Sequence, residues 1–115
     1  LSAGFALYVD PPFLAFYTYD AAGAVAQTVA LHTYTVGRAF TAIGVHNPRS
    51  YTALFVDGAL VSSTSSTKSW TAQNTFNLGW SGSGGVWSGG LTDVCLFAKA
   101  LTPDEVGVQH HWMKV

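Results

Sequence analysis

The sequence predicts an all-β protein, an antiparallel sandwich with one short helix near the C-terminal end. Turn-forming Gly, Pro, Asn and Asp residues recur at short intervals along the 115 residues. The segments between them are rich in aromatic and β-branched residues, as strands are. A pattern typical of a helix start occurs only after residue 100. Antiparallel strands joined by short turns form sandwiches or jelly rolls.

Eight strands are predicted between these turns. The first two flank Asp10-Pro11-Pro12, and the third follows the turn at residues 20–23. The fourth begins after Gly37 and ends at Asn47-Pro48, and the seventh and eighth flank a glycine-rich loop that starts at residue 81. The predicted strands are residues 5–9, 13–19, 24–31, 38–46, 51–56, 59–63, 75–80 and 91–97.

The clearest local signal is Asp57-Gly58, which lies between two apolar runs. A type I′ turn needs a positive φ at both central residues, and Asp and Gly tolerate it well. Residues 51–56 and 59–63 should therefore pair antiparallel. The Ser- and Thr-rich residues 62–69 are predicted to form a polar loop after that hairpin.

The predicted helix begins at Thr102-Pro103, with Glu105 three positions after Thr102. That spacing is a capping box with proline in the first turn. The run from His110 to Met113 is predicted either to dock back on the sheet as a helix end or to reach a neighbouring molecule.

Composition excludes some classes of protein. Five basic and six acidic residues leave a formal charge of −1. The chain therefore lacks the excess of basic residues that is typical of a nucleic-acid binder. Apolar stretches are all interrupted before about 20 residues, so no membrane-spanning helix is expected. Only 10% of residues are charged and 49% are hydrophobic. Something other than charge must therefore cover the surface.

Three motifs together resemble the laminin-G-like group of concanavalin A-type jelly rolls. They are the hairpin Leu-Phe-Val-Asp-Gly at residues 54–58, the glycine-rich start of a strand with Asp93 before Val94, and the Ala-Leu-Thr-Pro-Asp-Glu run at residues 100–105. The resemblance covers roughly residues 31–106 and implies one jelly-roll domain over residues 1–115. The family usually has further strands before this region. Their absence here predicts a reduced sandwich, strands elsewhere in a longer chain, or strands supplied by a neighbour.

Several predicted strands are apolar on both faces, which indicates cover on both sides. The clearest are residues 5–9, 13–17 and 53–56. One face belongs to the core, and the other is predicted to form a ligand groove or a subunit interface. Alanine- and tyrosine-rich surface is the alternative.

Hydrolysis is not expected, although some concanavalin A-like folds are glycoside hydrolases. Their mechanism needs two carboxyl groups on either side of the scissile bond. The chain has one glutamate, Glu105, at the predicted helix cap, while Asp57 belongs to a turn and Asp93 has no obvious partner. We predict that the protein is not an enzyme.

No metal site is assigned. His110 and His111 are adjacent and would point about 100° apart on a helix, so the four histidines do not suit zinc. The resemblance leaves calcium open as a cofactor, without assigned ligands. Cys95 stands alone in an apolar run and is predicted to be a small buried hydrophobe, with an intermolecular disulfide as the alternative.

The candidate ligand site consists of aromatic and amide side chains. Sugars stack their apolar faces on aromatic rings while amides bind the hydroxyls. Trp80 and Trp87 flank a glycine-rich loop, and Asn74 and Asn77 precede it. The alternative is that both tryptophans pack in the core.

The sequence therefore predicts a noncatalytic module that binds carbohydrate or glycoprotein, located outside the cell or on the surface of a particle. The rival prediction is a structural or interaction domain of a larger extracellular or virion assembly, whose apolar strand faces are buried against protein neighbours or further copies. The chain begins at Leu1 without a signal-peptide pattern, as expected of a mature or excised piece.

Overall fold

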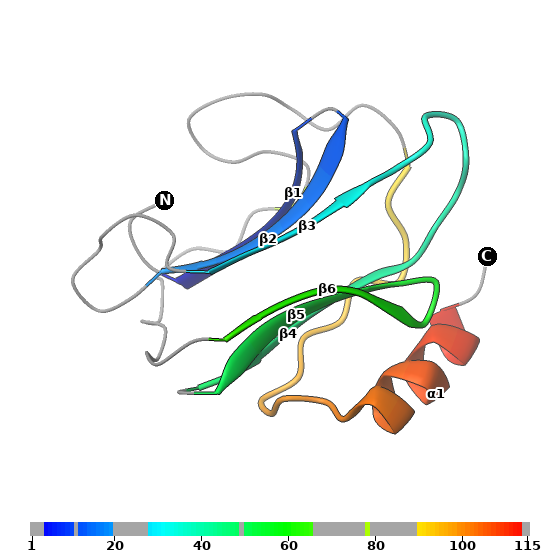
Figure 1. Ribbon diagram of the computed structural model, residues 1–115. Helices are drawn as coiled ribbons and strands as arrows, with labels where there is room; N and C mark the ends of the chain where they lie inside the picture. Colours follow the sequence, from blue (N-terminus) through cyan, green and yellow to red (C-terminus); the bar gives the residue numbers. More distant parts are fainter. Residues whose placement is uncertain are drawn as a thin grey trace.

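In the part of the chain that the structure describes, two three-stranded antiparallel sheets lie face to face, with one helix against the outer face of the second sheet (Figure 1). The computed structural model describes residues 4–10, 12–19, 28–48, 50–65, 78 and 90–113. The first sheet has the order β1 (Gly4–Asp10), β2 (Phe13–Tyr19), β3 (Thr28–Thr33). The second has the order β4 (Ala42–Asn47), β5 (Tyr51–Val56), β6 (Ala59–Ser65), and α1 spans Pro103–Met113.

The boundaries of β2 and β5 agree with the sequence prediction, and those of β4 and β6 do not. β4 starts at Ala42 rather than at Arg38, because Arg38 donates a backbone hydrogen bond to Thr35 that closes a turn. β6 continues to Ser65 although a loop was expected from residue 62, because β5 supplies a ladder partner as far as Tyr51. Hydrogen bonds to a neighbouring strand thus override weak local preferences.

β1 and β3 are placed close to where they were expected. β1 extends the predicted strand by one residue at each end. β3 continues to Thr33, whereas the prediction ended at residue 31, and its predicted first residues, 24–27, lie outside the described residues. The predicted strand at 75–80 also lies outside them, except for Leu78.

The hairpin between β5 and β6 confirms the predicted turn. Asp57 and Gly58 have φ values of 51° and 82°, both positive as a type I′ turn requires. Gly58 is also needed for space, because a Cβ built there would lie 2.9 Å from His110 Cδ2. The turn therefore fixes the antiparallel register of β5 and β6 and lets α1 approach.

The predicted strand at residues 91–97 is wrong. These residues form no strand, and all of them are exposed. Asp93 has a φ of 53°, which interrupts the extended backbone that a strand needs. The prediction of a buried Cys95 fails for the same reason: its thiol is free and exposed, because the apolar run around it is not packed into a sheet.

The first core lies between the two sheets. Its buried side chains are Leu14 and Phe16 of β2 and Leu54 of β5. Phe16 lies directly over Gly44, where an added Cβ would meet the ring at 2.4 Å. The absence of a side chain at Gly44 thus allows the two sheets to approach each other.

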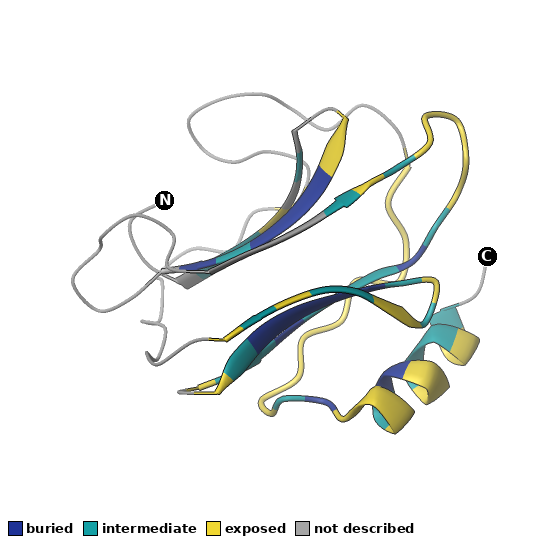
Figure 2. Cartoon of the chain, viewed as in Figure 1, coloured by how far each residue is buried: buried dark blue, intermediate teal, exposed yellow. Residues whose placement is uncertain are grey.

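The second core lies between β4, β5 and α1 (Figure 2). It contains Val45, Ala53 and Phe55 from the sheet, with Leu101 and Val106 from the helical region. Alternate residues of β5 therefore enter different cores, Leu54 the first and Ala53 and Phe55 the second. The outer face of residues 53–56, predicted to form a groove or subunit interface, is covered by the chain's own helix.

The cover of the first sheet is less complete than that of β5. In β1, Leu7 is 42% exposed, although Phe5 and Val9 on the same face pack against the core between the sheets. In β2, Ala15 is fully buried while Phe13 is 40% exposed. Apolar cover on both sides is thus complete for β5 and partial for the first sheet.

Candidate functional site

The predicted ligand-binding residues Trp80, Trp87, Asn77 and Asn74 lie outside the described residues. Leu78, the described residue among them, is 58% exposed. Their role as a ligand site remains a prediction.

One polar cluster joins α1 to the turn after β5. Asp57 accepts a hydrogen bond from the Thr41 backbone N–H at 3.1 Å, and its own N–H donates to the Thr41 carbonyl at 3.0 Å. The Thr41 hydroxyl forms a hydrogen bond of 2.7 Å with His110 Nδ1. Thr41 is 7% exposed, and it links the turn to the helix. The cluster is structural, because the Asp57 carboxylate already serves the turn.

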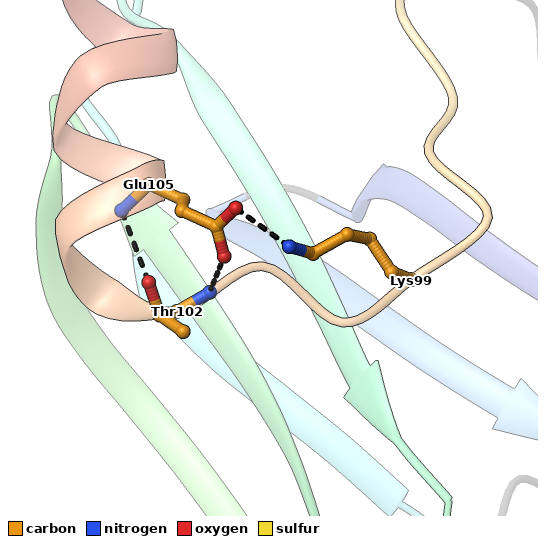
Figure 3. Close-up of polar contacts among 3 residues, drawn as sticks. All are labelled: Lys99, Thr102 and Glu105. Atoms are coloured by element: carbon orange, nitrogen blue, oxygen red, sulfur yellow. Dashed lines mark hydrogen bonds and ion pairs between the residues drawn. The ribbon is translucent and has the colours of Figure 1, made fainter.

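A second cluster is the capping box at the start of α1 (Figure 3). The Thr102 N–H donates to Glu105 Oε1 at 3.0 Å, and the Glu105 N–H donates to the Thr102 hydroxyl at 3.2 Å. Lys99 Nζ donates to Glu105 Oε2 at 2.7 Å. The Lys99 hydrogen bond, and next the Thr102 backbone, lower the pKa of the Glu105 carboxyl. Both oxygens of the sole glutamate are thus engaged at the N-terminal cap of the helix.

A third cluster lies between the sheets. His46 Nδ1 forms a hydrogen bond of 2.8 Å with the Thr52 hydroxyl across β4 and β5. Burial lowers the pKa of the His46 imidazole, because the charged form loses its hydration. Among the described residues, His46 Nε2 and the Thr18 hydroxyl are buried polar atoms without a hydrogen-bond partner. The fold therefore disfavours protonation of this imidazole.

Within the described ranges, no three His, Cys, Asp or Glu side chains come together as a metal-binding group. His110 is half-buried and His111 is exposed, as expected of adjacent helical residues that point in different directions. Calcium remains without assigned ligands.

A shallow groove of about 320 Å³ runs beside α1. Phe97 and Leu101 line one side, and the helix contributes Val108, Gln109 and the acidic pair Asp104 and Glu105. Its volume is at the lower end of the range for small-molecule sites, about 300–1,000 Å³. The groove is mainly apolar, and its acidic residues lie in the first turn of the helix.

The outer face of α1 is an apolar surface that sequence reasoning did not identify. Trp112 is 78% exposed and Val108 is 60% exposed. The exposed part of α1 lies on the side of the helix away from the sheets (Figure 2). The spacing of four residues between Val108 and Trp112 was a usable signal. The buried side of the helix could not be assigned without knowing which residues meet β4 and β5.

The C-terminal run docks back on the fold through His110, which is one of the two alternatives that the sequence left open. His110 docks on the hairpin turn, while Trp112 points away from the protein and packs edge-on against His111 with ring centroids 6.0 Å apart. The same helix end therefore serves the fold on one side and presents an aromatic surface on the other.

A comparison with known families identifies the family to which this fold belongs. Residues 2–107 match the laminin-G family described as the concanavalin A-like lectin/glucanases superfamily. The chain belongs to this family. The resemblance inferred from the hairpin and capping-box motifs is thus confirmed, and membership implies a jelly-roll sandwich.

One solved structure supports the fold. It is the crystal structure of an S-layer domain-containing protein, residues 221–444, from Clostridium thermocellum. The match has a TM-score of 0.51 at 12% identity and covers 94% of this chain. The chain spans 64% of the length of that structure. A comparison with curated proteins finds no match. In the described part of the concanavalin A-like domain, the helix is too short and polar to span a membrane.

Proposed function

We propose that this concanavalin A-like domain is a noncatalytic recognition module that binds carbohydrate or a glycosylated surface. Its family includes lectins and glucanases by description, so binding and hydrolysis are the two activities to separate. The family match supports the carbohydrate-binding part of the proposal. The capping box supports the noncatalytic part, because the only glutamate has both carboxylate oxygens engaged by Thr102 and Lys99. A glycosidase needs two carboxyl groups facing the substrate.

The proposed binding residues are Trp80 and Trp87, with Asn74 and Asn77 as hydrogen-bonding partners. Trp80 and Trp87 would stack on sugar faces, and the amides would bind hydroxyl groups. The residue types and their proximity in sequence support this choice.

A glycan array tests the recognition role. Wild-type protein should be retained by a subset of glycans, and replacing both Trp80 and Trp87 by Ala should abolish retention while thermal unfolding stays cooperative. Val36→Ala is the control, because it removes an apolar side chain that is 83% exposed and lies outside both the proposed site and α1. Undiminished retention by the double variant would contradict the proposed site. Hydrolysis of the same glycans above a buffer blank would contradict the noncatalytic role.

A second candidate function is assembly with protein neighbours. The observation that favours it is the exposed segment before α1, in which Leu91, Val94 and Leu96 are 51%, 48% and 62% exposed. Contiguous apolar surface of this kind commonly marks an interaction site. The S-layer protein of similar fold supports a location outside the cell or on the surface of a particle for this domain.

Light scattering at several concentrations tests the assembly role. A defined oligomer would support it, and replacing Leu96 by Ser should then reduce the oligomer if the segment before α1 takes part. A monodisperse monomer that binds glycans would leave recognition as the function of this domain.

A further inference from the structure

The outer face of α1 carries acidic, apolar and imidazole side chains in an order that can pair with the same face of a second copy. Its exposed residues are Asp104, Gly107, Val108, His111 and Trp112. They lie on one side of the helix because positions separated by three, four, seven and eight residues share a face. The opposite side holds the fully buried Val106 and the docked His110. The exposed face is therefore a surface that the described part of the chain does not cover.

We propose that two copies of this protein associate through antiparallel α1 helices related by a two-fold axis. When the helices cross between Gly107 and Val108, Asp104 of one copy faces His111 of the other, because both lie about one turn from the crossing point. The imidazole N–H can then donate to the carboxylate, and the pair occurs twice by symmetry. This charge complementarity selects a second copy as the occupant.

The centre of the face allows close approach. A Cβ built at Gly107 would meet nothing within 4 Å, so the backbone there is open on its outer side. Val108 of the second copy, 60% exposed in the single chain, can pack against it. Small residues opposite larger ones permit the close packing of two helices.

The groove beside α1 provides a site for Trp112 of the second copy. Trp112 and the groove residues Glu105, Val108 and Gln109 lie toward the same side of the helix. The two-fold axis places this side of both helices on the same side of the dimer. Each Trp112 then lies beside the first turn of the other helix, where the groove begins. Phe97 and Leu101 would then cover an indole that is 78% exposed in the single chain.

This dimer rests on the assembly role proposed above, and it identifies the partner as a second copy of the chain. Sedimentation equilibrium of the whole chain, with a reducing agent to prevent disulfides through the exposed Cys95, tests it. The mass should rise with concentration from 12.2 kDa toward twice that value. Trp112→Ala should weaken self-association by about tenfold or more, as for truncation of a buried aromatic anchor. A wild-type chain that remains monomeric at millimolar concentration would overturn the proposal.

Two further sets of variants test the register. Gly107→Arg adds bulk where the single chain has space, so it should block association while thermal unfolding remains cooperative. Asp104→His and His111→Asp should each weaken the dimer, and the two together should restore it. A double variant as weak as either single one would overturn the antiparallel arrangement.

The failure of the dimer can be told apart from the failure of assembly. An oligomer that Leu96→Ser removes and that Trp112→Ala leaves unchanged would overturn the α1 dimer while keeping the assembly role. Glycan binding is tested with variants of Trp80 and Trp87. Its outcome is therefore independent of the α1 dimer and of the assembly role.

Discussion

At the scale of single residues, His46 combines burial with incomplete hydrogen bonding. Its Nδ1 is paired with Thr52, while Nε2 is buried without a partner. A charged imidazole in that position would lack hydration and an acceptor, which explains the lowered pKa. On the inward-facing positions of the described strands, His32 of β3 is the other titratable side chain. It pairs in register with Leu14, toward the opposite end of β2 from Thr18.

The protonation of His46 makes stability depend on pH. Above its ordinary pKa of 6.5, the imidazole is neutral in both the folded and the unfolded chain. As the pH falls below that value, the unfolded chain binds a proton that the folded chain resists, so the free energy of unfolding decreases until the lowered folded pKa is reached. His46→Gln should reduce this loss in urea unfolding measured across the acid range. His32→Gln, which leaves His46 in place, is the control, and equal pH profiles for wild type and His46→Gln would contradict the assignment.

At the scale of elements, α1 is determined by a local signal and a tertiary contact. The capping box between Thr102 and Glu105 satisfies backbone N–H groups that no helical carbonyl can reach. Val106, fully buried against β4 and β5, contributes about 1.5–3 kcal/mol by leaving water. The start of the helix is thus set by the sequence, and its orientation is set by the sheet.

Removing the cap tests the local part of this account. Thr102→Ala deletes the hydroxyl that accepts from the Glu105 N–H, so the free energy of unfolding should fall by about 0.5–2 kcal/mol. Urea denaturation measures the change. Thr35→Ala, at an exposed loop threonine, is the matched control and should have little effect. A cap variant as stable as that control would show that the sheet contact alone holds the helix start.

At the scale of the whole molecule, the approach of the two sheets depends on Gly44. Phe16 of the first sheet occupies the space that a side chain at position 44 would need. The two layers therefore meet at a contact between a ring and a backbone. The second sheet is in turn covered by α1, so three layers depend on the packing of β4 and β5.

Filling that contact should destabilise the domain. Gly44→Ala places a Cβ 2.4 Å from Phe16 Cδ1, and such overpacking should cost about 1–3 kcal/mol of unfolding free energy. Adding Phe16→Leu should recover part of the loss. Gly90→Ala is the matched control: nothing lies within 4 Å of a Cβ built there, so the free energy of unfolding should change by less than about 1 kcal/mol. Equal stability of the two glycine variants would contradict this account of sheet packing.

The sequence by itself determined the features whose causes are local. The hairpin at Asp57-Gly58 follows from the positive φ that its turn requires, and the capping box follows from the spacing of Thr102 and Glu105. These motifs also indicated the family, because each of them can be recognised from a few neighbouring residues of the sequence.

Only the tertiary structure decided the features that depend on distant residues. The apolar run at 91–97 resembles a strand, but a strand exists only when another supplies its hydrogen bonds, and here Asp93 turns the backbone instead. The Ser-rich end of β6 forms a strand because β5 lies beside it. Likewise, whether Val106 or Trp112 faces the core depends on where the sheet meets α1, which fixed the outer face proposed for dimerisation.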